Sequence, residues 1–286
     1  MKPSVVIAGC GDVGTRLGVK LAAEGWTVYG LRRHPENLPS ALIPLAADLA
    51  DTACPSAWPR SAPNYLVFCA TPDTGTEAAY RATYVEGLQH VLGWLEQTGQ
   101  KPYRVLFVSS TSVYGQQEGE WVDETSPCMP EGYSGRIMLE AEEIALNSHI
   151  PATVVRMAGI YGPGREWLLN QVRAGYQVPA SPPQYGNRIH ADDAAGLLAF
   201  LLQKDDAATP LAPLYLGVDN SPVPLHDVVT GLRELLGVTH TGTAAVIRRA
   251  GSKRCRNTRA RRLGWEPHYP SWREGYAALL AGQPLP

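Results

Sequence analysis

The chain has 286 residues, of which 44% are hydrophobic, with a formal net charge of −2 and five cysteines. That length can bury a complete α/β core with a second, smaller lobe, and the near-neutral charge argues against nucleic-acid or membrane-surface binding. The sequence holds no apolar run of transmembrane length, and its cysteines show no C-x-x-C spacing, so we expect a cytoplasmic protein with reduced thiols and no zinc site.

The first predicted element is a short apolar strand at 4–8 that runs directly into a glycine-rich turn. Gly9, Gly11 and Gly14 form the pattern G-x-G-x-x-G, and an amphipathic helix follows at 15–24. In a dinucleotide-binding fold these glycines allow a tight turn, close approach of a pyrophosphate and close helix–strand packing. The helix N-terminus adds free N–H groups and a partial positive charge. The sequence therefore predicts a nucleotide site here; the alternative is a glycine-rich turn of another α/β protein.

Strands and helices continue to alternate through the first half of the chain, which predicts a Rossmann-type, doubly wound parallel sheet. The stretch after residue 160 is rich in glycine and proline, so we expect loops of a smaller C-terminal substrate lobe there. The expected dinucleotide-binding domain is 1–160, with 189–218 returning to it, and the expected substrate-binding lobe comprises 161–188 and 219–286. Further strands are predicted at 27–31, 65–70, 104–109, 152–156 and 214–218, and helices at 77–97, 134–148, 191–203 and 226–236.

The end of the second predicted strand bears on which nicotinamide dinucleotide binds. An acidic residue there accepts hydrogen bonds from the ribose of NAD, whereas an arginine accommodates the 2′-phosphate of NADP. Arg32 and Arg33 occupy this place, and two guanidiniums bind a phosphate by charge-assisted bonds. We therefore predict NADP, with NAD also open and a pair of surface arginines as the alternative. Asp48, after the third apolar stretch, is a candidate for contacting the adenine amine or for capping a helix.

Five later segments occur in a fixed order: VSSTSVYG at 108–115, VDETSP at 122–127, YSGR at 133–136, RMAGIYGPGR at 156–165 and RIHADDAA at 188–195. Together they resemble the extended short-chain dehydrogenase/reductases, also called the NAD-dependent epimerase/dehydratase family, over nearly the whole chain. The resemblance implies a catalytic serine at Ser110, which orients the reacting carbonyl or alcohol, and a catalytic tyrosine at Tyr133. The glycine fingerprint and the resemblance together predict these cofactor-binding residues: Gly9, Gly11, Asp12, Val13, Gly14, Arg32, Arg33, Asp48, Leu49, Ala70 and Thr71.

The chain departs from the family pattern at the position four residues after the tyrosine. The family places a lysine there to stabilise the phenolate, because an ordinary tyrosine is a poor base at neutral pH. Here that position is Ile137, and Tyr84 stands near the place where the family often has an asparagine. Three interpretations follow: Arg136 serves as a substitute cation, Tyr133 acts as a neutral proton donor, or redox chemistry is lost and the protein only binds the nucleotide.

Other motifs narrow the chemistry. Thr111 and Ser112 stand where the dehydratase branch carries acidic residues, so sugar dehydration is not expected. His190 with two following aspartates offers poor metal geometry, and we expect no metal site. Arg165 and Arg188 are candidate substrate contacts to a phosphate or carboxylate, with a turn and a helix-flanking charge as the alternative. A run of basic residues at 248–262 is either a solvated helix face or a subsite for an anionic substrate.

The prediction from sequence is an NADP(H)-binding oxidoreductase or epimerase. It would act on a carbonyl or alcohol of a small substrate, such as a nucleotide sugar or another anion. The alternative is a non-catalytic dinucleotide-sensing protein. The family resemblance also implies a homodimer, and no nucleic-acid or membrane partner is expected.

Overall fold

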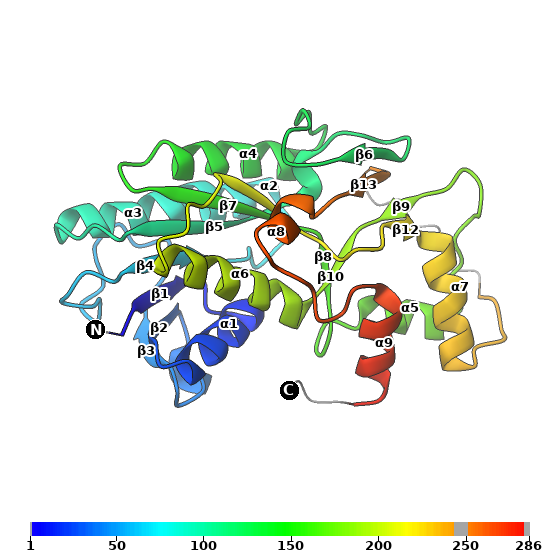
Figure 1. Cartoon of the computed structure of the whole chain (residues 1–286), viewed down its shortest axis with the longest axis horizontal. Coiled ribbons are helices and arrows are strands. Elements are labelled where there is room, and N and C mark those ends of the chain that lie inside the picture. Colours follow the sequence, from blue (N-terminus) through cyan, green and yellow to red (C-terminus); the bar gives the residue numbers. More distant parts are fainter. Residues whose placement is uncertain (1, 243–250, 283–286) are drawn as a thin grey trace. The chain divides into compact units, whose positions relative to one another are not determined.

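The computed structural model describes residues 2–242 and 251–282, and its main element is a seven-stranded parallel sheet (Figure 1). The strand order is β11-β7-β5-β4-β1-β2-β3, which is the doubly wound order with one added strand. This confirms the predicted fold class. The strands are β1 (Ser4–Ala8), β2 (Thr27–Arg32), β3 (Ile43–Ala46), β4 (Tyr65–Phe68), β5 (Arg104–Ser110), β7 (Ala152–Met157) and β11 (Leu214–Gly217).

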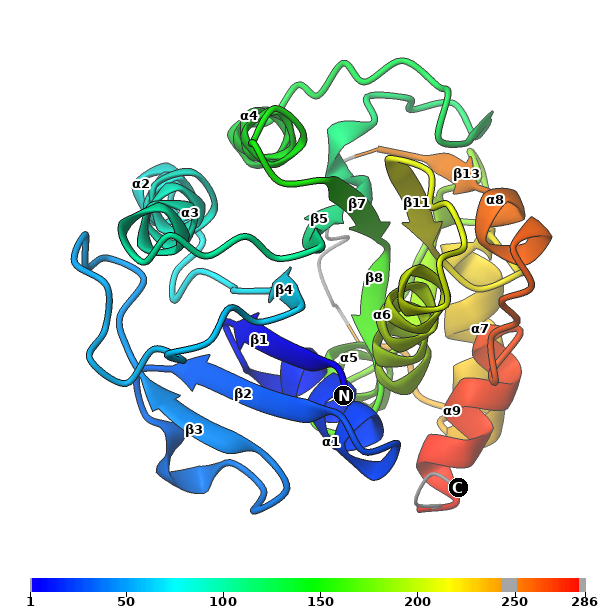
Figure 2. The same ribbon diagram turned by 60° about the vertical axis from the view of Figure 1, so that its left-hand side comes forward.

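Helices cover both faces of this sheet, as Figure 2 shows from the side. On one face lie α2 (Glu77–Arg81), α3 (Gly87–Gln97) and α4 (Tyr133–Leu146), and a π-helical turn at Ala82–Glu86 joins the first two. On the other face lies α1 (Asp12–Ala23), beside the C-terminal part of α6 (Ala191–Asp206). The inner strands β1 and β4 are apolar along their length because both of their faces are buried in this way, whereas only Leu45 is buried in the edge strand β3.

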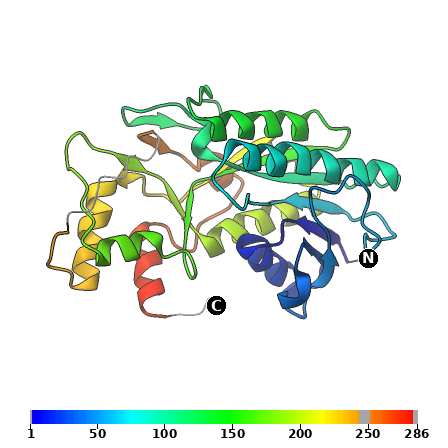
Figure 3. The same ribbon diagram turned by 180° about the vertical axis from the view of Figure 1, so that it is seen from behind.

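The chain divides into two compact units, each described separately here. The first comprises 1–113, 131–156 and 195–215, and the second 114–130, 157–194 and 216–286. The second unit contains three small two-stranded sheets and four helices in its described part, best followed from behind in Figure 3. Its strand pairs are β6 (Glu120–Val122) with β13 (Lys253–Cys255), β8 (Gly159–Tyr161) with β10 (Arg188–His190), and β9 (Tyr185–Gly186) with β12 (Val223–Pro224).

Three helices of the second unit pack around one apolar core: α5 (Trp167–Arg173), α7 (Leu225–Leu236) and α9 (Trp272–Leu280). The short helix α8 (Thr258–Arg262) contributes no residue to this core. Leu169 and Val172 of α5 are fully buried in this core, against side chains of α7 and α9. The helix α5 was not among the predicted elements; it lies between the two loop-rich segments of this stretch. None of the described helices is long and apolar enough to cross a membrane.

A buried ion pair fixes α4 against the sheet in the first unit. Glu142 of α4 and Arg156 of β7 are 4% and 6% exposed, respectively. Arg156 donates from Nε to Glu142 Oε1 at 2.9 Å and from Nη2 to Oε2 at 2.7 Å. Ser109 of β5 donates its hydroxyl to Oε1 at 2.5 Å. One carboxylate therefore connects a helix to two strands of the sheet.

This arrangement predicts unequal effects of two identical changes on α4. Glu142→Gln should lower the free energy of unfolding by about 3–5 kcal/mol, because it leaves the buried Arg156 guanidinium without its counter-charge. Glu140→Gln removes only the exposed pair with Arg81 and should cost about 0–1 kcal/mol. Chemical denaturation of both variants measures the difference. Equal losses would show that the buried pair does not hold the helix.

Candidate functional site

The glycine loop after β1 leaves no room for side chains where it meets the neighbouring strand. Gly9 has φ +80°, and a Cβ there would lie 2.3 Å from Cα of Ala70. At Gly14 a Cβ would lie 3.0 Å from Cγ2 of Ile7, so α1 packs closely on β1. At Gly11 the nearest atom would be 3.9 Å away, which leaves this position open. The three glycines therefore have the three geometries that a dinucleotide site requires.

The same loop forms the N-terminus of α1. The helix begins at Asp12, three residues earlier than the sequence predicts, and its first turn follows Gly11 directly. The first N–H groups of a helix have no partner within the helix, and they carry its partial positive charge. Gly11 leaves the space before them free of any Cβ. These residues fit a bound pyrophosphate, with Asp12, Val13 and Gly14 supplying backbone N–H groups.

The two arginines after β2 are already engaged. Arg33 binds Asp73 in a bidentate ion pair, with Nη1–Oδ2 and Nη2–Oδ1 distances of 2.8 and 2.7 Å, on an exposed part of the surface. Arg32 lies half-buried, with Nη1 3.5 Å from the carbonyl oxygen of Cys10 in the glycine loop. The Asp73 carboxylate thus occupies the guanidinium that we predicted for the 2′-phosphate of NADP, and a bound phosphate would have to replace it.

Other predicted cofactor residues lie around the same strands. Asp48 accepts a hydrogen bond from the Ala50 N–H at 3.0 Å and caps a turn. The helix-cap interpretation of Asp48 is wrong, because no helix lies between β3 and β4. Leu49 contacts α3 through its carbonyl oxygen, which lies 2.7 Å from Nδ1 of His90. Thr71 is exposed directly after Ala70.

Ser110 and Tyr133 lie at the ends of their elements. Ser110 is the last residue of β5, and its hydroxyl accepts a hydrogen bond from the Ser112 N–H at 3.1 Å. Tyr133 is the first residue of α4, and its hydroxyl donates to the carbonyl oxygen of Gly75 in a short hydrogen bond. The Tyr133 ring packs edge-on against Tyr80, with the centroids 5.6 Å apart.

The loss of the family lysine is visible in the geometry of α4. Ile137 is 2% exposed and belongs to the core of the first unit. Arg136 is exposed and donates from Nη1 to the carbonyl oxygen of Glu131 at 2.5 Å. In this structure Arg136 therefore does not act as a substitute cation for Tyr133. The interpretations that remain are a neutral tyrosine and a protein without turnover.

The topology brings the predicted residues of the first unit to one edge of the sheet. The glycine loop, Ala70 and Ser110 follow the carboxyl ends of the neighbouring strands β1, β4 and β5. A crossover helix between parallel strands runs back across the sheet, so α4 begins at this same edge with Tyr133. The hydrogen bond to Gly75, in the loop after β4, confirms that placement of Tyr133. In open α/β sheets ligands bind at this edge.

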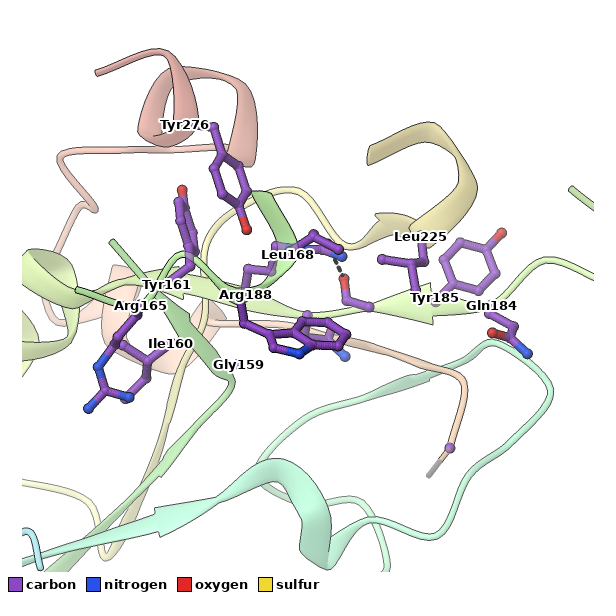
Figure 4. A pocket seen from close by; sticks show the side chains of 14 residues that line it. Gly159, Ile160, Tyr161, Arg165, Leu168, Gln184, Tyr185, Arg188, Leu225 and Tyr276 are labelled. Carbon is purple, nitrogen blue, oxygen red and sulfur yellow. Dashed lines mark hydrogen bonds between the residues drawn. The ribbon is translucent and has the colours of Figure 1, made fainter. Parts of the chain in front are cut away.

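The second unit has a pocket of about 110 Å³, shown in Figure 4. The tyrosines Tyr161, Tyr185 and Tyr276 come from β8, β9 and α9 and line it together with Arg188 of β10. Arg188 is 7% exposed, and its Nη1 donates to the carbonyl oxygen of Gly186 at 3.1 Å. Arg165, the other predicted substrate contact, also lines the pocket and is exposed. Aromatic and aliphatic side chains line the pocket together with the polar side chains of Arg165, Gln184, Asn187 and Arg188.

The aspartates of the family block at 188–195 hold the backbone together. Asp193 accepts hydrogen bonds from the N–H groups of His268 and Tyr269 at 2.6 and 3.0 Å. Asp192 lies 3.1 Å from Nδ1 of His190 through its Oδ2. Among residues 2–242 and 251–282, no cluster of histidine, cysteine, aspartate or glutamate has the geometry of a metal site.

A buried carboxyl near this pocket was not predicted from the sequence. Asp219 is 3% exposed, and its Oδ1 accepts a hydrogen bond from the Ser221 N–H at 3.0 Å. Within the described chain, its Oδ2 and the hydroxyl of Tyr161 are buried without hydrogen-bond partners. Burial raises the pKa of Asp219 to about 7, although the Ser221 N–H and the Arg188 charge oppose this shift. Any sequence signal for this residue is weak, because the position is a single acid after an apolar strand.

The raised pKa of Asp219 predicts a pH dependence of stability. Its folded pKa of about 7 exceeds the unfolded value of about 3.9, so the native state binds the extra proton between these values. The contribution of Asp219 to stability is therefore greatest below about pH 4 and is lost as the pH rises through about 7.

Asp219→Asn should remove this pH-dependent loss. The difference in the free energy of unfolding between variant and wild type should therefore be larger above pH 7 than at pH 4, by on the order of 2–4 kcal/mol in favour of the variant. Denaturation curves between those pH values measure it, with the exposed Asp51→Asn as the control. A constant difference between wild type and Asp219→Asn at all pH values would contradict the shift.

Comparison with known proteins supplies the family context for these sites. The model of the NAD dependent epimerase/dehydratase family matches residues 5–212. A solved structure assigned to the NAD-dependent epimerases/dehydratases, from Methylobacillus flagellatus, is 38% identical with a TM-score of 0.82, covering 99% of each chain. Protein YeeZ of Escherichia coli K12 is 28% identical over 70% of this chain and 73% of its own. A 3-diazoavenalumate denitrifying reductase of Streptomyces sp. is 26% identical over 95% of this chain and 98% of its own.

Proposed function

Because the chain belongs to the NAD-dependent epimerase/dehydratase family, we propose that it is an NADP(H)-dependent reductase acting on a carbonyl group of a small anionic substrate. The observation that carries this proposal is the placement of Ser110 and Tyr133 at the sheet edge that also carries the side-chain-free glycine loop. Similarity over nearly the full length to a reductase of Streptomyces sp. supports the reaction type.

Each residue of this edge has a part in the proposed reaction. The glycine loop and the α1 N-terminus would hold the dinucleotide, which supplies a hydride when bound. Ser110 would donate a hydrogen bond to the reacting carbonyl oxygen and so orient it. Tyr133 would give that oxygen a proton as a neutral phenol, after its hydroxyl leaves the carbonyl of Gly75.

The missing lysine favours reduction over oxidation. A phenol that lacks a neighbouring cation donates a proton more readily than it removes one at neutral pH. The i+4 position on the face of α4 that carries Tyr133 is Ile137, which is buried and uncharged. The proposed direction therefore starts from the reduced dinucleotide and ends with an alcohol.

A non-catalytic dinucleotide-sensing protein is the second candidate function. The burial of Ile137 and the engagement of the Tyr133 hydroxyl by Gly75 favour it, because both features leave the tyrosine without activation. The two candidates share the cofactor site and differ in turnover alone. Binding and turnover are therefore measured separately below.

The arginines after β2 predict tighter binding of NADPH than of NADH. Arg33→Gln should weaken NADPH binding about tenfold, since one charge-assisted contact to the 2′-phosphate is lost, and should leave NADH binding unchanged. Asp73→Asn should have the opposite effect on NADPH, because it removes the carboxylate that now binds Arg33. Fluorescence titration of wild type and both variants with each dinucleotide measures this. Tighter binding of NADH by the wild type would refute the NADP assignment.

The catalytic role of Tyr133 predicts a loss of turnover without a loss of binding. Tyr133→Phe should lower the rate of NADPH oxidation with a responsive carbonyl substrate about 10²–10⁴-fold, the usual contribution of a general acid. Its affinity for NADPH should stay within about twofold. Tyr80→Phe is the matched control, because this neighbouring ring contacts Tyr133 and should keep its packing.

A panel of aldehydes, ketones and sugar nucleotides is screened by NADPH absorbance. An active wild type with an equally active Tyr133→Phe would remove the proposed acid. A wild type that binds NADPH but is silent on the whole panel would favour the sensing protein.

A further inference from the structure

The structure separates the basic residues of the run 248–262 by what they contact. Arg248 and Arg249 lie outside the described residues. Lys253 is buried, and its ammonium donates to the carbonyl oxygen of Tyr114 at 3.1 Å. The guanidiniums of Arg259 and Arg261 lie 3.9 and 2.9 Å from carboxylates of Glu124 and Glu266, respectively. Three arginines remain: Arg254 in β13, Arg256 directly after it, and the exposed Arg262 on α8.

Arg254 and Arg256 lie against aromatic rings. β13 pairs with β6 in parallel, with Arg254 opposite Trp121. The guanidinium carbon of Arg254 is 4.8 Å from the ring centroid of Trp121 and 4.8 Å from that of Tyr185. The guanidinium carbon of Arg256 is 4.3 Å from the Trp121 centroid, and this tryptophan is 45% exposed. We refer to Tyr185, Arg254, Trp121 and Arg256 as the aromatic–arginine ladder.

The ladder is held in place by the backbone around it. Gly119 has φ +84°, and a Cβ there would lie 2.8 Å from the Tyr185 ring, so only glycine allows this loop to pass so close. The carbonyl oxygen of Gly119 accepts a hydrogen bond from Arg254 Nε at 2.6 Å. The Arg254 side chain is therefore fixed between two rings and one carbonyl. A fixed guanidinium loses less conformational entropy when a ligand binds.

The ladder joins the pocket of the second unit through shared residues. Tyr185 lines the pocket, and its ring also contacts the guanidinium of Arg254. Asn187, another lining residue, donates to the carbonyl oxygen of Lys253 and accepts from the Cys255 N–H, at 2.9 and 2.7 Å. These bonds hold β13 beside the pocket wall. Trp167 and Leu225 add an aromatic and an aliphatic wall to the same pocket.

The two ladder guanidiniums are available to an anion. Neither makes an ion pair with a carboxylate in the part of the chain that the structure describes, and both face the same tryptophan. An anion beside either guanidinium is favoured electrostatically. A guanidinium binds a carboxylate or a phosphate through two parallel N–H donors, while the aromatic faces suit a flat ring.

We propose that the ladder binds the anionic oxygen group of an aromatic small molecule whose ring enters the pocket, with a carboxylate or a phosphate ester as that group. Whether this molecule is also the substrate depends on the proposed function. Its binding to the ladder and the pocket does not, because binding needs neither the dinucleotide nor turnover.

Calorimetric titration of the full chain without dinucleotide tests the proposal with defined probes. Cinnamate and phenyl phosphate carry both a ring and an anion, whereas acetate and inorganic phosphate carry only the anion. We expect at least one aromatic probe to bind with a Kd on the order of 1 mM or tighter, and about tenfold more tightly than the matching anion without a ring. The better of the two aromatic probes identifies the anionic group.

Single substitutions then locate the site. Arg256→Gln and Arg254→Gln should each weaken binding of that probe about tenfold, while Arg262→Gln, which removes an equal charge on α8, should change it less than about twofold. Arg256 is exposed, so its replacement leaves the fold intact, and thermal unfolding checks both ladder variants. Equal losses from Arg256→Gln and Arg262→Gln would mean a general basic field and overturn the ladder, as would the absence of binding by both aromatic probes.

These outcomes remain distinct from those of the proposed function. If the probe binds through the ladder but the protein oxidises no NADPH with any carbonyl compound, the ladder site is supported and the reductase is refuted. If the protein turns over and Arg254→Gln and Arg256→Gln leave the KM unchanged, the reductase is supported and the ladder site is refuted.

Discussion

The arrangement of the sheet edge that carries Ser110 and Tyr133 depends on the ion pair between Glu142 and Arg156. Two charges taken out of water cost several kcal/mol each, and they are tolerated only where geometry and further hydrogen bonds compensate. Here the pair is bidentate, and Ser109 supplies a third hydrogen bond. Ser109 immediately precedes Ser110, and Glu142 lies on the helix that Tyr133 begins. The carboxylate therefore sets the spacing of the two proposed catalytic hydroxyls, although neither of them touches it.

The arginines of this protein differ in what holds their guanidiniums. Arg156 is buried on a carboxylate, where its charge is fully used in holding α4 to the sheet. Arg254 and Arg256 lie on aromatic rings, which orient a guanidinium while leaving its N–H donors able to bind an anion. Arg33 stands between these cases, because an exposed carboxylate holds it in a pair that water and salt weaken. How each arginine is partnered thus separates structural from recognition roles better than its position in the sequence does.

The sequence predicted what depends on local pattern and missed what depends on distant pairing. Buried parallel strands read as apolar runs, so β1 was predicted to the residue, and the glycine spacing, which is also local, marked the turn after it. The start of α1 was placed late because Asp12 and Val13 were assigned to the turn. β6 and β13 have three residues each and lie more than 130 residues apart, so no periodicity reveals them. In the sequence Glu142 looks like any polar residue of a helix, so its buried ion pair was not predicted. Asp73 lies 40 residues beyond Arg33, so their ion pair was not predicted either. The interpretation in which Arg136 serves as a substitute cation does not hold in this structure, because Arg136 donates to the nearby Glu131 carbonyl oxygen.

Ile137 stands where the family has a lysine, and this replacement affects the proposed proton transfer more than the packing of the helix. A lysine at this place would have to bring a charge into a position that is now 2% exposed, at the cost of desolvation. The isoleucine instead adds to the packing of α4, the helix whose position the Glu142–Arg156 pair already fixes. Removing the cation lowers the tendency of a neighbouring phenol to lose its proton, so a tyrosine here is suited to giving a proton. The isoleucine therefore serves the packing of α4, and the proposed reduction asks of Tyr133 only the proton of a neutral hydroxyl.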